Sequence, residues 1–279
     1  MKHLIVTADD FGASAPINEA VERACTGGIL TTASLMVAGG AAQDAIARAR
    51  RLPNLRVGLH LVVVCGRATL SPATLPDLAP DGQLPANLFR AGVEFFFQPR
   101  LRRQLAEEIR AQFDAFKSSG LALDHVNAHN HMHLHPTVCS LMLAIGRDYG
   151  LTAVRVPYEP PARTTRQGLA GRLFDLAVLG PWVRVMVRRL RRAGLRHNDF
   201  VFGLRDTGRM TTERVLRILA ELPEGTSEMY FHPAVRRAAE NEIPPEYECE
   251  QEFEALTSPR VAAAIRMHGI VRTGFNELG

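Results

Sequence analysis

The sequence predicts an α/β protein built as a distorted or incomplete (β/α) barrel with about seven mainly parallel strands. Short apolar runs alternate with helix-length segments, a pattern typical of parallel strands joined by crossover helices. Acidic and histidine residues stand where several of these runs end, which is where barrel sites form. The 279 residues, 46% hydrophobic and 22% charged, suit one large domain spanning 1–279. A doubly wound open sheet is the alternative.

The elements follow from the apolar runs and the residues that interrupt them. The first half is predicted to contain strands at Leu4–Ala8, Leu30–Val37, Leu55–Val63 and Leu123–His129, and helices at Pro16–Cys25, Ala41–Leu52, Arg102–Lys117 and Pro136–Tyr149. The second half is predicted to contain the strand Thr152–Val156, a basic helical region, the segment Asp199–Gly203, the helix Thr211–Leu222, the strand Glu228–Phe231, and a last helix and strand near Val261–Val271. The Pro- and Gly-rich segment from Cys65 to about Gly92 is predicted to be a long loop, which inside a compact domain is more often functional than idle.

Composition excludes several classes of protein. No run of about 18 apolar residues would cross a membrane, and Met1 to His3 lead directly into a strand, unlike a signal peptide. We therefore expect a cytoplasmic protein. The formal charge is +4, and few aromatic residues lie among the arginines, so nucleic acid is not an expected partner.

Asp9 and Asp10 close the first predicted strand. Two adjacent carboxylates raise each other's pKa, and a divalent cation removes that cost. Such a pair allows one carboxylate to bind a metal and the other to handle protons. The alternative is an Asp that caps the next helix beside a solvated neighbour.

Five of the ten histidines fall in one short window: His125, His129, His131, His133 and His135. Unpaired buried imidazoles are costly, so five core histidines are hard to explain, yet five cannot bind one ion. We expect the strand to end near His129 and the later histidines to line the rim. His60 lies in the C-terminal half of another strand, so Asp9-Asp10, His60 and His129 should converge on one rim. One carboxylate and two imidazoles with open positions indicate a catalytic site for one divalent ion, Zn²⁺ or Mg²⁺.

Two further residues end predicted strands. His232 follows Phe231 and is either a proton donor to a leaving group or a rim residue that stacks on substrate. Arg155 either binds a substrate anion or holds Asp9 by pairing with it. His131 and His133, on the rim, are further candidates for substrate binding.

At these residues the chain resembles the YdjC-like carbohydrate deacetylase family. The matching pieces are Ala8 to Gly12, Gly58 to His60, His125 to Pro136 and Phe231 to Ala234. The resemblance implies a distorted barrel that removes acetyl groups from N-acetylated sugars with one divalent metal. It implies that Asp10, His60 and His129 bind the metal and that Asp9 is the base. We expect His232, or another rim histidine, to protonate the leaving amine. Asn127-Ala128 stands where the family usually has Asp-Ser, so a carboxylate behind the ligands is missing.

Two other stretches, Val154 to Glu159 and Gly194 to Asp199, resemble the hopanoid-biosynthesis-associated branch of that family. That resemblance implies an N-acetylglucosaminyl hopanoid substrate, a sugar carried by a membrane triterpenoid. It also adds Glu159, in the first stretch, to the candidates for substrate binding. The alternatives are a deacetylase of soluble N-acetylated oligosaccharides and a non-catalytic sugar- or lipid-binding module with a residual metal site.

The basic helical region around 165–196 is expected to be an insertion in the domain. In Leu173–Leu195, Trp182, Met186 and Leu190 recur at helical spacing, while Arg184, Arg188, Arg191 and Arg192 line another face. Basic amphipathic helices with one interfacial tryptophan often lie on anionic membranes, so we expect peripheral contact with the inner face of the cytoplasmic membrane. The alternative is a barrel-covering helix with a solvated arginine face. The sequence gives no oligomeric state.

Overall fold

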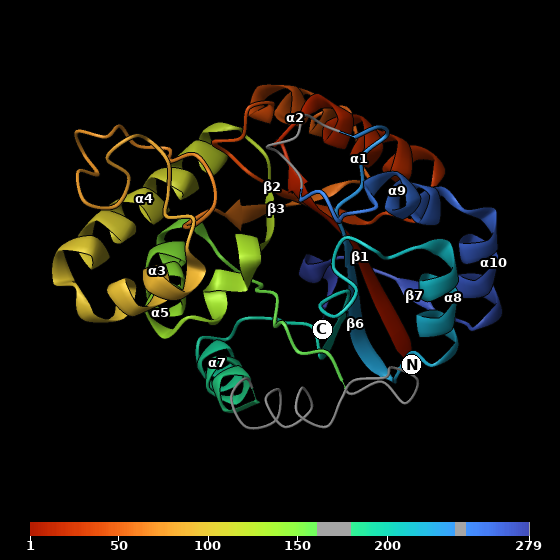
Figure 1. The fold of residues 1–279 in the computed structure, drawn as a ribbon. Coiled ribbons are helices and arrows are strands. Elements are labelled where there is room, and N and C mark those ends of the chain that lie inside the picture. The colour runs from red at the N-terminus through yellow and green to blue at the C-terminus, as the bar shows by residue number, and fades with distance from the viewer. Residues whose placement is uncertain (161–179, 238–243, 279) are drawn as a thin grey trace.

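A curled sheet of parallel strands forms the centre of the molecule, and helices pack around it (Figure 1). The structure is a computed structural model that describes residues 1–160, 180–237 and 244–278. The strands run in the order β4-β3-β2-β1-β6-β5, and β7 pairs with the start of β1. Every pairing between named strands is parallel. The predicted incomplete (β/α) barrel is confirmed.

The described elements have the following bounds. The strands are β1 Lys2–Phe11, β2 Thr32–Leu35, β3 Arg56–Leu61, β4 Leu123–Ala128, β5 Phe200–Phe202, β6 Gly225–Phe231 and β7 Val271–Arg272. The α-helices are α1 Ala15–Gly27, α2 Ala42–Ala49, α3 Leu88–Phe97, α4 Pro99–Ser118, α5 Pro136–Gly146, α7 Gly180–Arg192, α8 Thr212–Ala220, α9 Cys249–Thr257 and α10 Pro259–Met267. Short 3₁₀ turns are η1 His129–Leu134, η2 Arg147–Tyr149 and η4 Phe275–Glu277.

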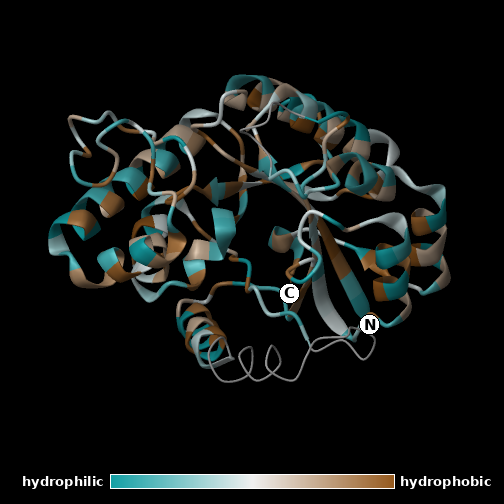
Figure 2. Cartoon of the chain, in the orientation of Figure 1, coloured by the Kyte–Doolittle hydropathy of each residue, from teal (hydrophilic) through white to brown (hydrophobic). Residues whose placement is uncertain are grey.

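The inner strands are apolar because the sheet is covered by helices. Leu4, Ile5 and Val6 of β1 have no exposed surface, as expected for a parallel strand buried on both faces. Figure 2 shows a hydrophobic stretch on β1 and both colours on the outer helices. None of the described helices combines the length and apolarity needed to cross a bilayer.

Strand register brings the candidate residues to one edge of the sheet. In β1 and β6, Ala8 pairs with Phe231, so Asp9 and His232 each follow directly after a paired position. In β3 and β4, His60 pairs with Asn127. The pairing of β1 with β2 is irregular between Ala8 and Phe11, and Asp10 there has a φ of 60°. Aspartate tolerates this left-handed conformation better than most residues, and such bulges often redirect a side chain.

Two predicted elements differ from the structure, and one helix was not predicted. The predicted strand Thr152–Val156 is replaced by two isolated bridges. Val154 pairs with Val126 and Ala153 pairs with Arg196, so the segment pairs with each neighbour at one position only. The loop predicted from Cys65 to Gly92 ends earlier, since α3 begins at Leu88 behind Asn87, whose side chain accepts a hydrogen bond from Arg90 N at 2.9 Å. Helix α9 was not predicted.

The basic helix α7 covers only part of the expected insertion, and residues 161–179 lie outside the described part of the chain. Its buried residues are Val183, Met186 and Leu190, whereas Trp182 is 43% exposed. Of the row Trp182, Met186 and Leu190, the last two are buried together with Val183, and Trp182 is not. Helix α7 thus packs on the barrel and leaves its arginines and Trp182 at the surface.

Candidate active site

Three strand ends bring Asp10, His60 and His129 together. Asp10 comes from the bulge that ends β1, His60 from β3, and His129 is the first residue after β4. One ligand atom from each residue lies within 4.8 Å of the other two. His60 Nε2 lies 3.3 Å and His129 Nδ1 3.1 Å from the same Asp10 Oδ1. Two imidazole nitrogens thus converge on one carboxylate oxygen.

This donor set fits a divalent cation. Burial alone would raise the pKa of Asp10, but His129 and His60 hold it well below its usual value, so the carboxylate is ionised. One carboxylate and two imidazoles leave coordination positions for water and substrate, as catalytic zinc sites do. Imidazoles favour Zn²⁺, whereas a carboxylate with several waters also permits Mg²⁺. The donor set accommodates both ions.

Asp9 lies behind this group and is held by a buried arginine. Burial would raise the pKa of Asp9, but Arg155 and His60 lower it well below its usual value. Arg155 Nη1 and Nη2 donate to the two Asp9 carboxylate oxygens at 2.5 and 3.0 Å. Both side chains are almost fully buried. A bidentate pair fixes the orientation of the carboxylate and keeps it ionised. Of the two roles predicted for Arg155, the structure shows the pairing with Asp9.

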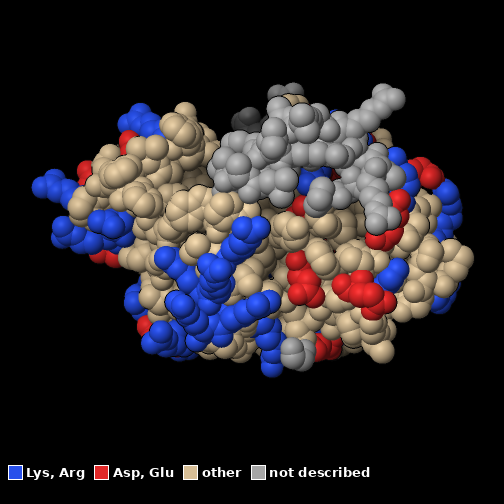
Figure 3. Space-filling view, turned by 90° about the horizontal axis from the view of Figure 1, so that it is seen from below, with Lys and Arg blue, Asp and Glu red and all other residues tan. Residues whose placement is uncertain are grey.

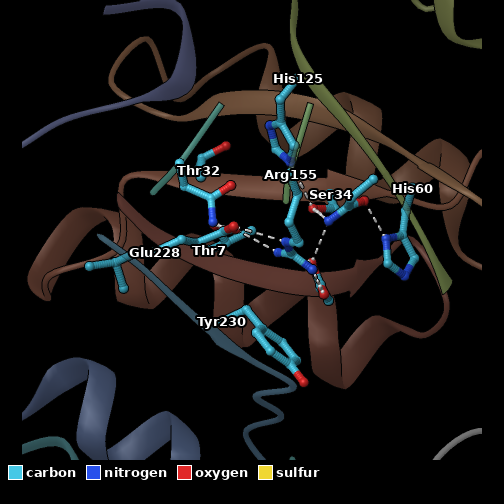
Figure 4. Close-up of polar contacts among 12 residues, drawn as sticks. Thr7, Thr32, Ser34, His60, His125, Arg155, Glu228 and Tyr230 are labelled. Atoms are coloured by element: carbon cyan, nitrogen blue, oxygen red, sulfur yellow. Dashed lines mark hydrogen bonds and ion pairs between the residues drawn. The ribbon is translucent and has the colours of Figure 1, made fainter. Parts of the chain in front are cut away.

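The same arginine binds a second buried carboxylate (Figure 4). Arg155 Nε and Nη2 donate to Glu228 at 2.9 and 2.7 Å, and Thr7 Oγ1 donates to Glu228 Oε1 at 2.6 Å. The guanidinium also lies 4.9 Å from the centre of the Tyr230 ring. Burial lowers the pKa of Arg155, but Asp9 and Glu228 outweigh it and raise the pKa above its usual value. One permanent cation therefore supports two carboxylates beneath the site.

Asn127 connects the base candidate to a ligand candidate. Its Oδ1 lies 2.6 Å from His60 Nδ1, and its Nδ2 donates to Asp9 Oδ1 at 3.2 Å and to Ser34 Oγ at 2.9 Å. With His60 Nδ1 as the donor, Nε2 stays free to face Asp10. Asn127 thus contacts His60, and its amide donates to Asp9, which a carboxylate could not do.

A cavity of about 520 Å³ opens beside these residues. Its wall is formed by Asp9, Asp10, His60, Cys65, Leu88, Ala128, His129, Asn130, His131, Thr207, Tyr230, His232, Pro244, Pro245 and Tyr247. Tyr230 OH lies 2.7 Å from Thr207 Oγ1 and 3.2 Å from His131 Nε2. A second cavity of about 300 Å³ shares Asp10, Cys65 and His129 with the first. Two of the three candidate metal ligands, Asp10 and His129, therefore lie where the two cavities meet.

His232 lines the larger cavity with an unused ring nitrogen. Its Nδ1 is buried and has no hydrogen-bond partner among the described residues. Its backbone N–H donates to Glu252 Oε2 at 2.5 Å, which anchors the residue at the end of β6. Burial lowers the pKa of His232, although Asp10 and Asp9 partly oppose that effect. The ring is therefore mainly neutral near pH 7 and is a stronger acid than usual once protonated.

Strand β4 ends next to His129, as the sequence predicted, but the histidines of this window do not all line the rim. Asn130 and His131 adopt φ angles near +50°, which turns the chain sharply after β4. His125 lies in the interior, with Nε2 3.1 Å from Ser34 Oγ and Nδ1 3.0 Å from Asp124 Oδ2. His135 starts α5 and contacts Phe95 and Phe96. These two are structural residues rather than rim residues.

Of the four residues predicted to bind substrate, the structure places only His131 on the cavity wall. His133 is buried, accepts a hydrogen bond from Ala128 N at 3.1 Å and contacts the Arg155 backbone oxygen. Arg155 is fully buried, and Glu159 accepts a hydrogen bond from Arg205 N at 3.0 Å. These three residues contact neighbouring backbone and side chains and do not line the cavity, and their role in substrate binding stays a prediction.

Sequence reasoning missed Tyr230, Tyr247 and Thr207 as cavity residues and Glu252 as the anchor of His232. Tyr230 could have been identified from the sequence, because it lies at the end of the predicted strand Glu228–Phe231, two residues before His232. Glu252 had none, since its contact with His232 depends on how α9 packs beside β6.

Comparison with known proteins places the chain in a family. The family model described as YdjC-like protein matches residues 3–267. The carbohydrate deacetylase of Homo sapiens is 30% identical, with 99% of this chain and 90% of that protein aligned. The carbohydrate deacetylase of Geobacillus stearothermophilus is 29% identical over 99% of this chain and 98% of its own. That of Brevibacillus brevis is 36% identical, but the match covers 57% of this chain and 59% of that protein.

A solved structure shares the fold. A protein of Enterococcus faecalis V583, provisionally described as cleaving cellobiose phosphate, aligns with a TM-score of 0.76 at 22% identity over 100% of this chain and 99% of its own. At that identity the likeness shows the fold alone. The family match, by contrast, spans nearly the whole sequence and includes all the strand-end residues described above. The chain belongs to the YdjC-like protein family.

Proposed function

We propose that this protein is a metal-dependent carbohydrate deacetylase that hydrolyses the acetamide of an N-acetylated sugar to acetate and a free amine. The observation that carries the proposal is the convergence of Asp10, His60 and His129 beside a buried, ionised Asp9 at the wall of a cavity. Full-length relatives described as carbohydrate deacetylases support it. A binding module would not need the second carboxylate or the arginine that holds it.

Each side chain has a role in this proposal. Asp10, His60 and His129 would hold a divalent ion, which supplies Lewis acidity to the scissile carbonyl and lowers the pKa of water. Asp9, kept ionised and oriented by Arg155, accepts a proton from the attacking water. His232 donates a proton to the leaving amine nitrogen. The carbon–nitrogen bond breaks, and the water oxygen remains in the acetate.

The finer substrate proposal is an N-acetylglucosaminyl group on a hopanoid lipid. The two stretches that resemble the hopanoid-associated branch contact each other: Asn198 Oδ1 accepts from Val156 N at 2.7 Å, and Asn198 Nδ2 donates to Val156 O at 2.8 Å. Within the expected membrane-contact region Leu173–Leu195, α7 exposes Trp182 and the arginines Arg184, Arg188, Arg191 and Arg192. These features support peripheral contact at the inner face of the cytoplasmic membrane. A soluble N-acetylated oligosaccharide is the competing substrate.

Acetate release tests the chemistry. Purified protein with added Zn²⁺ or Mg²⁺ should release acetate from N-acetylglucosaminyl substrates, and the lipid-linked sugar should be preferred at least tenfold in kcat/KM. Asp9→Asn should lower kcat by about 10³-fold or more, because it removes the proton acceptor, while metal affinity measured by calorimetry changes little. Asp10→Asn should instead lower metal affinity. The exposed Asp148→Asn is the matched control. Near-normal turnover by Asp9→Asn would exclude Asp9 as the base.

A further inference from the structure

Helix α3 exposes an apolar face to solvent. Phe89 is 83% exposed, Phe97 73%, Phe96 47% and Val93 45%. Surface helices normally direct one apolar stripe to the core and polar residues to water. Contiguous exposed apolar residues on this scale mark an interaction site far more often than scattered single ones do.

This face is not the one that holds α3 in the fold. The buried residues of α3 are Ala91 and Phe95, one turn apart on the core side. Phe89, Val93, Phe96 and Phe97 lie on the opposite side, at the i, i+4, i+7 and i+8 positions of a helix. We call these four residues the outer α3 face. Since α3 is already anchored by its core side, the outer face needs another explanation.

The outer α3 face lies close to the site. Leu88, the first residue of α3, lines the 520 Å³ cavity together with Asp10 and His129. Phe95 and Phe96 contact His135 at the start of α5, and Arg189 of α7 donates to Ser140 of α5 at 3.0 Å. Helices α3 and α7 therefore flank α5 on one side of the molecule (Figure 1). The cavity wall and the outer α3 face therefore adjoin at two neighbouring residues, Leu88 and Phe89.

Exposed arginines follow the outer α3 face in the chain, at a position where they do not stabilise helix α4. Arg100, Arg102 and Arg103 are exposed in the first turns of α4, directly after Phe97, and no acidic residue occupies the first turn. Positive charge at a helix N-terminus opposes the helix dipole, so local helix stability does not explain these residues. Figure 3 shows basic side chains at the end of the molecule that holds α3 and α4, and a cluster of them where α7 lies. An anionic surface would complement both groups.

We propose that the outer α3 face, bordered by Arg100, Arg102 and Arg103, docks on a lipid bilayer that contains anionic lipids. The phenylalanines enter the interface between headgroups and acyl chains, and the arginines contact lipid phosphates. This contact sets the cavity mouth against the bilayer, where the sugar of a membrane lipid is presented to Asp9 and the candidate ligands. The inference rests on the proposed function, which it deepens by naming the surface that brings a lipid-linked substrate to the site.

Vesicle sedimentation tests the surface. The full chain should bind phosphatidylcholine vesicles that contain 30% phosphatidylglycerol, and should bind pure phosphatidylcholine vesicles at least tenfold more weakly. Phe89→Ser with Phe97→Ser should weaken binding to the anionic vesicles about tenfold or more, because the buried apolar area is lost. Arg100→Gln with Arg102→Gln and Arg103→Gln should weaken binding and flatten its salt dependence. Met267→Ser, which changes a 75% exposed residue of α10 at the opposite end of the molecule, is the matched control and should bind as wild type does.

Acetate release from a soluble N-acetylglucosamine oligomer separates this inference from the proposed function. All these variants should keep wild-type release from that substrate, since none of the changed residues lines the cavity. Wild-type vesicle binding by the Phe89→Ser, Phe97→Ser variant would overturn the inference and leave the deacetylase proposal intact. So would a stable dimer in light scattering that this variant abolishes, because a second copy would then be the occupant. Absence of acetate release from every N-acetylated sugar, with vesicle binding retained, would count against the proposed function alone.

Discussion

The interior beneath the site and the outer α3 face depart from the ordinary distribution of residues in opposite ways. Beneath the site, Asp9, Arg155 and Glu228 are charged and fully buried or nearly so. On α3, Phe89 and Phe97 are apolar and largely exposed. Every charge of the interior group has a partner within the chain, whereas none of the four residues of the outer α3 face joins the hydrophobic core of the described residues, and Phe96 contacts only the edge of α5 at His135. The buried charges are thus satisfied within the chain, whereas the exposed phenylalanines leave apolar surface that a partner outside the chain would have to cover.

The largest expected effect comes from removing the cation of the interior. Arg155→Met should lower the free energy of unfolding by about 3–5 kcal/mol, because it leaves two buried carboxylates without their partner. Urea unfolding followed by circular dichroism measures this. Arg188→Met, on the exposed side of α7, should cost no more than about 0.5 kcal/mol. Equal losses of unfolding free energy in the two variants would contradict the inference that the two buried carboxylates depend on Arg155.

A pH effect of similar size should come from Glu252, a buried carboxyl that has backbone N–H donors instead of a cation. Burial raises the pKa of Glu252 to about 7 from an ordinary value of 4.5. The folded state therefore binds this proton more tightly than the unfolded chain does. The stabilising contribution is complete below pH 4.5 and is lost as the pH rises to about 7, a change of about 3 kcal/mol.

Glutamine does not titrate, so the unfolding free energy of Glu252→Gln should rise relative to that of the wild type as the pH increases from 5 to 8. Urea unfolding at four pH values gives the comparison, and the exposed Glu254→Gln should follow the wild-type curve. Parallel curves for Glu252→Gln and wild type would show that backbone donors keep this carboxyl ionised, and the interior would then hold one more charge than inferred.

The smallest of the three effects concerns the amide between His60 and Asp9. Asn127→Asp cannot donate to Asp9 Oδ1 or Ser34 Oγ and adds a like charge beside Asp9. We expect a loss of about 1–3 kcal/mol in unfolding free energy and weaker acetate release, since the base is no longer held on that side. Asn54→Asp in an exposed turn is the control. Unchanged stability and turnover would mean that this position tolerates a carboxylate and that Arg155 alone orients Asp9.

Much of the fold could be predicted from local pattern. Short apolar runs identified β1, β2, β3, β4 and β6, because strands buried on both faces are rich in apolar residues, although β4 and β6 also contain buried polar residues such as Asn127 and Glu228. Helix α3 was missed because its aromatic residues and the preceding Pro- and Gly-rich loop do not show a helical stripe with a polar side. A full strand was predicted around Ala153 and Val154, where the structure has only single bridges. These residues are apolar because they are buried, not because they form a full ladder of hydrogen bonds.

The residues at the strand ends could be identified from local pattern: Asp9, Asp10, His60, His129 and His232 each lie near an apolar run. They meet because parallel strands present their C-terminal ends on one edge. The contacts behind and around them depend on how the whole chain packs. Arg155 reaches Asp9 from 146 residues away and Asn127 from 118, and the outer α3 face becomes an exposed surface only when Ala91 and Phe95 turn inward. Contacts between such distant segments depend on packing, which no local pattern encodes.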